Sequence, residues 1–151
     1  MDTNIDGCEY IGKYIGEIHR ISCMHLSKKF SKFGIGSGQY LFLLNLYKNE
    51  GITQEELSEK LKLDKATTAR AIKKLELEGY VTRSKRENDR RAYSLMTTKK
   101  AQIIKEEVYL IMNEWEQMVK NCFTEEESKA LMSLLRKLTN SSLFSKEEFY
   151  E

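Results

Sequence analysis

The chain has 151 residues, of which 40% are hydrophobic and 32% charged, with a formal net charge of +2. This balance argues against a disordered chain and favours one soluble folded domain. No apolar run approaches the ~20 residues that span a bilayer, and the N-terminal residues lack the basic-then-apolar order of a secretory signal. We therefore expect a cytoplasmic protein without a membrane partner. The absence of proline and the low glycine count of 8 predict a mostly helical chain.

The charges are distributed unevenly along the chain. Residues 60–100 hold 13 Lys+Arg and 5 Asp+Glu, a net charge of +8, whereas the rest of the chain carries −6. A basic centre between acidic ends is typical of a DNA-binding protein, although a fluctuation on solvated helix faces produces the same pattern. The motifs of the basic region have to decide between these two interpretations.

The reactive side chains indicate neither a metal site nor catalysis. Cys8, Cys23 and Cys122 form no CxxC pair, and His19 and His25 are six residues apart on one expected helix. That spacing does not place both imidazoles on one face, so we expect free thiols, no metal and no other cofactor. The sequence also lacks a nucleophile elbow, a phosphate-binding glycine loop and a zinc-protease motif, so we do not expect an enzyme.

The hydrophobic spacing predicts two helices before the basic region. Over residues 8–32, apolar side chains recur at helical intervals. A turn with three glycines in five residues interrupts them, because closely spaced glycines are poor helix formers. Ser37 is expected to cap a second helix over residues 39–49, and Gly51 is expected to end it.

Two short helices joined by a tight turn are expected next. Thr53 and Glu56 form a capping box at the start of a third helix, which should run to about residue 62. Asp64 is placed to cap a fourth helix over residues 65–78. Two helices in this order are the skeleton of a helix-turn-helix. The expected core positions of the fourth helix are Thr68, Ile72 and Leu75.

After Gly79 the hydrophobic period changes from that of a helix to that of a strand. Residues 80–84 and 92–96 are predicted as two strands with a turn at 88–89. A hairpin directly after a helix-turn-helix predicts a wing. Two helices should end the chain: one over residues 98–121, and a last one opened by a second capping box, Thr124 with Glu127.

The fifth helix is longer than the winged core can cover. Its apolar stripe, together with the apolar faces of the first and last helices, needs another surface, and a twofold copy of the chain supplies one. The alternative is that these helices fold back into one monomeric core. We predict a mainly α fold with a small β-wing: one domain over residues 1–151, with a winged helix-turn-helix core at about 37–97 and dimerisation helices at about 8–33 and 98–142.

Residues 52–101 resemble the DNA-binding core of the multiple-antibiotic-resistance regulator (MarR) family. The family pattern is Asp-x-x-Thr-x-x-Arg, then Leu-Glu-x-x-Gly, an aliphatic strand residue and Asp-Arg-Arg. The chain departs from it where Glu87 and Asn88 replace a usual proline, and where residues 96–101 replace Leu-Thr-x-x-Gly. The matching residues, in order and spacing, are Asp64, Thr67, Arg70, Leu75, Glu76, Gly79, Val81, Asp89, Arg90 and Arg91.

The resemblance covers nearly the whole chain and implies a sequence-specific regulator of transcription that binds double-stranded DNA. Family members are typically homodimers on a pseudopalindromic operator, and the resemblance implies a repressor released by a small aromatic or phenolic effector. No residue is assigned to that effector. One alternative is a winged-helix module for protein–protein contact, which would bind DNA weakly and with little dependence on salt.

A second alternative is a thiol-based redox-sensing regulator. A redox subgroup of the family carries a cysteine early in its first helix, but the corresponding position falls near Gly12 rather than at Cys8. Glu9 is adjacent to Cys8, and its negative charge disfavours the reactive thiolate. These features favour regulation by a ligand over regulation by oxidation.

The fourth helix carries the expected DNA-reading side chains. A recognition helix reads bases from its first turns and meets phosphates further along, and an arginine pairs bidentately with guanine. Arg70 is the best candidate for such pairing, with a surface ion pair, for example to Glu76, as the alternative. Groove contacts are expected from Lys65, Thr67 and Arg70, and phosphate contacts from Lys73 and Lys74.

The predicted hairpin places five cations on one short wing, which suits the negative potential of the minor groove. The resemblance implies that Asp89 orients the wing and that Arg91 enters the groove or grips its edge. The alternative is a solvated hairpin with a weak local salt bridge. Four residues at helix starts can offer backbone N–H groups to phosphates or simply act as caps: Ser37, Gln39, Thr53 and Gln54. The wing cations are Arg83, Lys85, Arg86, Arg90 and Arg91.

Overall fold

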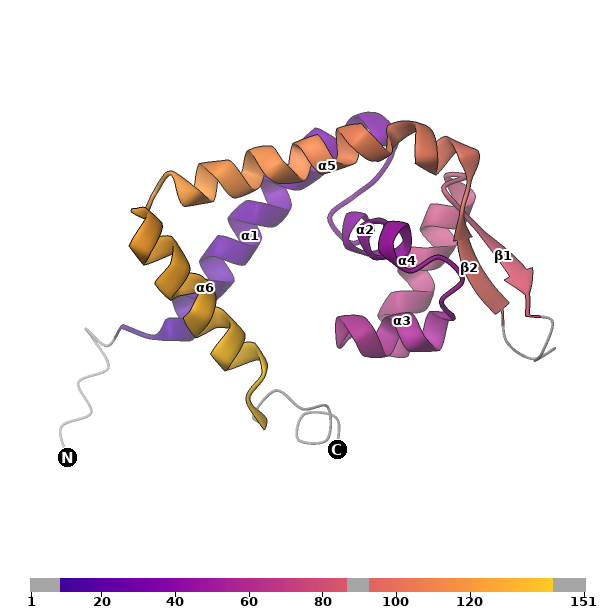
Figure 1. The fold of residues 1–151 in the computed structure, drawn as a ribbon. Coiled ribbons are helices and arrows are strands. Elements are labelled where there is room, and N and C mark those ends of the chain that lie inside the picture. The colour runs from indigo at the N-terminus through magenta and orange to yellow at the C-terminus, as the bar shows by residue number, and fades with distance from the viewer. Residues whose placement is uncertain (1–8, 87–92, 143–151) are drawn as a thin grey trace.

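The computed structural model describes residues 9–86 and 93–142 and shows the mainly α fold with a small β-wing that the sequence predicts (Figure 1). Its elements fall into two groups. A lobe contains the middle of the chain, and an arm contains the helices that precede and follow it. The lobe consists of α2 (Tyr40–Lys48), α3 (Gln54–Leu61), α4 (Lys65–Leu77), β1 (Val81–Lys85) and β2 (Tyr93–Thr97). The arm consists of α1 (Ile11–Phe30), α5 (Lys99–Lys120) and α6 (Glu125–Thr139), with a short 3-10 turn, η1 (Ser31–Phe33), after α1.

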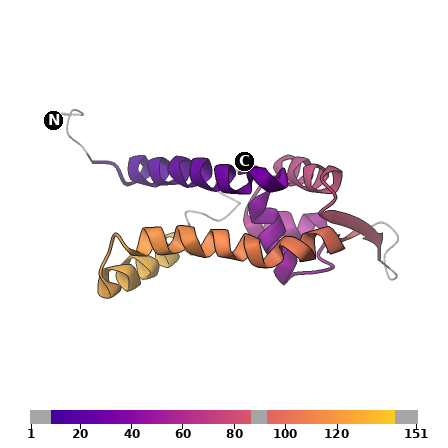
Figure 2. The ribbon, with the colours of Figure 1, turned by 90° about the horizontal axis from the view of Figure 1, so that it is seen from above.

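The arm extends away from the lobe. Figure 2 shows α1 on one side and α5 with α6 on the other, both reaching in the same direction from the lobe. The C-terminal part of α1 packs on α5, where Leu26, Phe30, Val108 and Ile111 are buried. An ion pair between Lys29 and Glu114 at 3.1 Å borders this contact. In the described part of the chain, no helix is long and apolar enough to cross a membrane.

The polar residues at the helix starts explain where the helices begin. The side chain of Thr53 accepts a hydrogen bond from the Glu56 N–H, and Glu56 accepts one from the Thr53 N–H, as the predicted capping box requires. The second capping box, at the start of α6, is also present. The carboxylate of Asp64 accepts from the Thr67 N–H at 2.7 Å and caps α4. These three predictions are confirmed.

The prediction that Ser37 caps α2 is wrong. The N-cap residue of α2 is Gln39, and no side chain caps that helix. The Gln39 side chain instead turns back and accepts a hydrogen bond from the Gly36 N–H at 2.9 Å. The Gly36 carbonyl in turn accepts from the Gln39 and Tyr40 N–H groups, so the glycine turn itself supplies the bonds that begin the helix.

The lobe is built around an apolar core to which every helix and strand contributes. Phe42, Leu57, Ile72 and Leu95 are at most 2% exposed and come from α2, α3, α4 and β2. The predicted inward positions of α4 are confirmed, since Thr68 and Ile72 are fully buried and Leu75 is 1% exposed. This packing determines which side of α4 faces outward.

The first wing strand begins one residue later than predicted, because Tyr80 closes the turn that ends α4. The Tyr80 N–H donates to the Leu75 carbonyl, and the Gly79 N–H donates to the Glu76 carbonyl, at 2.9 Å each. This is a Schellman ending, and Gly79 adopts the left-handed backbone that it requires (φ +79°). The Tyr80 side chain is buried and its hydroxyl donates to the Phe33 carbonyl at 2.7 Å.

The wing is an antiparallel pair in which Val81 lies opposite Thr97 and Lys85 opposite Tyr93. The segment between α2 and α3 adds backbone bonds to the far edge of β2. The Gly51 N–H donates to the Leu95 carbonyl at 2.9 Å, and the Leu95 N–H donates to the Ile52 carbonyl at 2.8 Å. The base of the wing is therefore held on both sides of β2.

Candidate nucleic-acid interface

The outward face of α4 is lined by polar and cationic side chains. Because Thr68, Ala71, Ile72 and Leu75 bury the opposite face, most of the other positions point to solvent. Thr67 is half-buried and the four cations are exposed. The sequence predicted these five residues on the outward side of one helix, and the structure has all of them on the part of α4 that the core leaves uncovered: Lys65, Thr67, Arg70, Lys73 and Lys74.

A chain of hydrogen bonds runs from the N-cap of α4 to Arg70. The Thr67 hydroxyl donates to the Asp64 carboxylate at 2.6 Å, and Arg70 Nη2 donates to the Thr67 hydroxyl oxygen at 3.1 Å. The bonds from Thr67 hold the pKa of Asp64 below its ordinary value. Arg70 takes part in none of the ion pairs formed within residues 9–86 and 93–142, and its expected alternative partner, Glu76, pairs elsewhere. Its guanidinium retains donors for a ligand.

Lys65 has an acidic partner from the preceding helix. Its ammonium lies 2.7 Å from the Glu55 carboxylate, and the two side chains are 79% and 64% exposed. This hydrogen-bonded ion pair raises the pKa of Lys65 and lowers that of Glu55. Glu55 was not expected from the sequence, because the two residues are ten positions apart and meet only through the angle between α3 and α4.

The first strand of the wing is joined to both helices of the helix-turn-helix by Arg83. Its Nε donates to the Glu76 carboxylate and its Nη2 to the Gln54 side-chain oxygen, each at 2.8 Å. Gln54 begins α3 and Glu76 lies in the last turn of α4. Arg83 and Gln54, which the sequence predicts to contact DNA, thus bond to each other in the free protein.

The two cations at the end of β1 differ in their surroundings. Lys85 is exposed and belongs to no ion pair formed among the described residues. Arg86 is half-buried and its Nη2 lies 3.0 Å from the Glu56 carboxylate. Three further expected contacts, Asp89, Arg90 and Arg91, lie outside the described residues.

The residues at the helix starts act as local caps or turn residues in the free protein. Thr53 and Gln39 accept the bonds described above, and Ser37 is exposed in the turn before α2. Thr53 and Asp64 occupy the Glu56 and Thr67 N–H groups, and other N–H groups at a helix start attract anions. The outer side of α4 and the described part of the wing together offer several positive charges, which suits the binding of a polyanion.

The sequence of this chain is similar to those of known regulators. The MarR family model matches residues 35–93. The uncharacterized HTH-type transcriptional regulator YybA of Bacillus subtilis (strain 168) is 35% identical over 128 residues, which cover 82% of this chain and 83% of YybA. The chain belongs to the MarR family.

Solved structures of MarR regulators have the same fold. A MarR transcriptional regulator from Methanosarcina mazei Go1 is 40% identical, with a TM-score of 0.82 over 90% of this chain and 98% of that one. A MarR family transcriptional regulator from Listeria monocytogenes, complexed with a 26mer DNA, is 29% identical, with a TM-score of 0.81 over 87% of this chain and 88% of that one. This MarR-family chain is accordingly a winged-helix, DNA-binding regulator of transcription.

Proposed function

We propose that this MarR-family protein binds specific double-stranded DNA sites as a homodimer and represses transcription until a small ligand releases it. The outward face of α4 carries the proposal: Arg70, Lys73 and Lys74 are exposed on the helix that follows the turn, directly beside the wing. This is the position from which a recognition helix enters the major groove. We propose Arg70 and Thr67 for base contacts and the two lysines for phosphates. We also propose a cytoplasmic location, because a protein in this role has to reach the DNA.

The exposed apolar surface of the arm supports a homodimer. On α1, Ile11 is 75% and Ile18 59% exposed, and on α6 Leu134 is 63% exposed. No residue of α6 is buried within the described chain. Apolar area of this extent marks an interaction surface, and a twofold partner would also set two recognition helices about one DNA turn apart.

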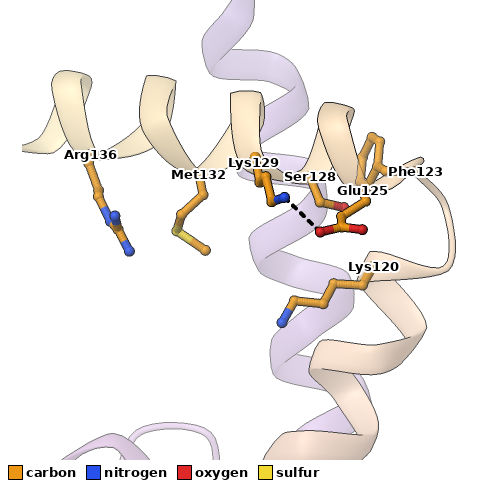
Figure 3. A pocket seen from close by; sticks show the side chains of 7 residues that line it. All are labelled: Lys120, Phe123, Glu125, Ser128, Lys129, Met132 and Arg136. Carbon is orange, nitrogen blue, oxygen red and sulfur yellow. Dashed lines mark ion pairs between the residues drawn. The ribbon is translucent and has the colours of Figure 1, made fainter.

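The corner between α5 and α6 belongs to the same uncovered surface. A hollow of about 500 Å3 lies there, and Figure 3 shows the side chains of Lys120, Met132 and Arg136 on its walls. Phe123 and Met132, each 41% exposed, are its apolar part. We propose that the arm of the second subunit covers this corner in the dimer.

A small anionic aromatic effector has a candidate place between α1 and α5. The Nε2 of His25 is buried and has no hydrogen-bond partner within the described residues, and its ring lies 5.1 Å from that of Trp115. Three lysines of α1 and η1 join His25 around a hollow of about 390 Å3. An unpaired imidazole nitrogen with cations nearby suits a carboxylate or phenolate. The three lysines are Lys28, Lys29 and Lys32.

Selection of bound duplexes from a random pool tests the DNA-binding part of the proposal. We expect an enriched pseudopalindrome and a dissociation constant that rises steeply with salt, because phosphate neutralisation releases counterions. Weak binding without an enriched sequence, and with a flat salt dependence, would instead support a protein-interaction module.

Titration of the bound duplex with salicylate, as a probe aromatic anion, tests ligand release. H25A should abolish the release of DNA by salicylate. Unchanged release by that variant would contradict the effector site.

A further inference from the structure

We infer that Arg86 is a positioning residue of the wing rather than a DNA contact. Its guanidinium fastens the end of β1 to the first turn of α3, and so determines how the wing is presented to DNA. This inference rests on the proposed DNA-binding function and deepens it. It also revises the expectation from the sequence, which counted Arg86 among the cations that touch DNA.

The hydrogen bonds of Arg86 reach three separate parts of the lobe. Nη2 donates to the Gly51 carbonyl and to the Glu56 carboxylate, at 3.0 Å each, and Nε donates to the Ser94 hydroxyl at 3.3 Å. Gly51 precedes α3, Glu56 lies in its first turn, and Ser94 is on β2. The donors of a guanidinium are fixed in one plane, so bonds in several directions restrict the orientation of the group they hold.

One carboxylate oxygen serves both the helix and the wing. Oε2 of Glu56 accepts from the Thr53 N–H at 2.7 Å, which closes the capping box, and from Arg86 at 3.0 Å. These bonds, led by the one from the Thr53 backbone, hold the pKa of Glu56 below its ordinary value, so the carboxylate stays ionised at neutral pH. The start of α3 and the residue that follows β1 are therefore both bonded to the same carboxylate oxygen.

Lys85, the cation next to Arg86, is less constrained by its surroundings. Lys85 is exposed and takes part in none of the ion pairs that the described residues form, whereas the Arg86 side chain is only 36% exposed. Arg86 already commits its Nε and Nη2 donors to these acceptors, so only Nη1 is left for a phosphate. A phosphate contact by Lys85 breaks no such bond, so Lys85 is a matched comparison one residue away.

The salt dependence of DNA binding separates the two roles. We expect R86Q to weaken binding of the selected duplex about tenfold with an unchanged slope of log Kd against log salt concentration. K85Q should lower that slope by about 0.9, the value for one lost phosphate contact. A drop in slope for R86Q as large as that for K85Q would overturn the inference.

A double-mutant cycle tests the route through Glu56. In E56Q the glutamine can still close the capping box, but the charge that holds Arg86 is gone. If Arg86 acts through Glu56, the effects of E56Q and R86Q on DNA affinity should overlap, so that the double variant binds no more weakly than R86Q alone. Additive effects would show that Arg86 acts independently of this carboxylate and would contradict the proposed route.

Hydrogen exchange on the free protein gives a readout that needs no DNA. We expect R86Q to speed exchange of the paired amides of β1 and β2 about tenfold, with K85Q and the amides of α5 unchanged. Unchanged exchange in R86Q would overturn the inference even if DNA binding were intact. Failure of the wild-type chain to bind duplex DNA would contradict the proposed function alone, because the exchange result would still stand.

Discussion

The ammonium of Lys65 lies 2.7 Å from the Glu55 carboxylate, so the first cation of α4, the proposed recognition helix, is paired with an acid of the preceding helix. A phosphate that approaches Lys65 has to compete with Glu55 and is repelled by it. Both side chains are largely exposed, which makes the pair easy to break. Glu55 is thus expected to weaken DNA binding without supporting the fold.

Neutralisation of Glu55 should therefore strengthen DNA binding. We expect E55Q to lower the dissociation constant for the selected duplex about 2- to 5-fold, the range for loss of one exposed ion pair. Fluorescence anisotropy at fixed salt measures this change. E116Q removes an acid of α5 that is paired with Lys120, and it should leave the affinity unchanged. Unchanged or weaker binding by E55Q would contradict a DNA contact by Lys65.

Arg70 and Lys73 should affect DNA binding in different ways. Because Arg70 lies in the early turns of α4, R70A should reduce discrimination at one base position by about 1–3 kcal/mol. K73Q should weaken binding to all duplexes alike and lower the salt slope by about 1. Competition between the selected duplex and its single-base variants measures both effects. Equal losses across all positions for R70A would assign Arg70 to phosphate.

The Asp64 cap should make stability depend on acidity. The hydrogen bonds from Thr67 hold its pKa below the ordinary value of 3.8, so the folded state favours the ionised carboxylate. This stabilisation is complete above the pKa of the unfolded chain and is lost as the pH falls through the lower folded value. D64N retains an N-cap acceptor but does not titrate, so its Tm should fall less steeply than that of the wild type between about pH 5 and pH 3.

Thermal unfolding of the wild type, D64N and D64A across this pH range tests the cap. D64A has no acceptor and should lose about 2–4 °C in Tm at pH 7, where D64N stays close to the wild type. Other acidic groups affect all three proteins alike, so the differences between them isolate residue 64. Parallel pH profiles for D64N and the wild type would show that the carboxylate contributes nothing through its charge.

The Tyr47 hydroxyl should contribute to the junction between lobe and arm. It donates to the Ala101 carbonyl at 2.6 Å in the buried contact between α2 and α5. Burial raises the pKa of Tyr47, so the hydroxyl remains a donor at ordinary pH. We expect Y47F to lower the free energy of unfolding by about 1 kcal/mol, the usual net value of one hydrogen bond. Urea unfolding measures it, with Y93F, an exposed tyrosine of β2, as a nearly neutral control.

An acid on the uncovered face of α1 should dissociate the proposed dimer. Ile18 is 59% exposed in the single chain, and I18D would place a charge in an apolar interface. We expect size-exclusion chromatography with light scattering to show a dimer for the wild type and a monomer for I18D. Operator affinity should fall more than about 100-fold, because one half-site is then lost. L77D, at an exposed residue of α4, should remain dimeric. A monomeric wild type would contradict the proposal.

Local rules of chain geometry account for what could be predicted from the sequence. Capping at Thr53, Asp64 and Thr124 depends on atoms within three residues, so pattern alone locates these helix starts. Ser37 was assigned wrongly, because a nearby glutamine offers a competing local bond that residue type does not reveal. Likewise, Tyr80 lies between the end of α4 and the start of β1. Its buried packing, which the sequence pattern does not reveal, places it with the helix ending rather than in the strand.

The amino-acid sequence by itself determined the order of the helices, the wing after the helix-turn-helix and the outward cations of α4, because each follows from periodicity and capping over a few residues. The partners of those cations were decided only by the tertiary structure. Lys65, Arg83 and Arg86 meet Glu55, Glu76 and Glu56 through the angle between helices and the path of the wing. Such contacts join residues 7 to 30 positions apart. They depend on how the core packs, which no local pattern encodes.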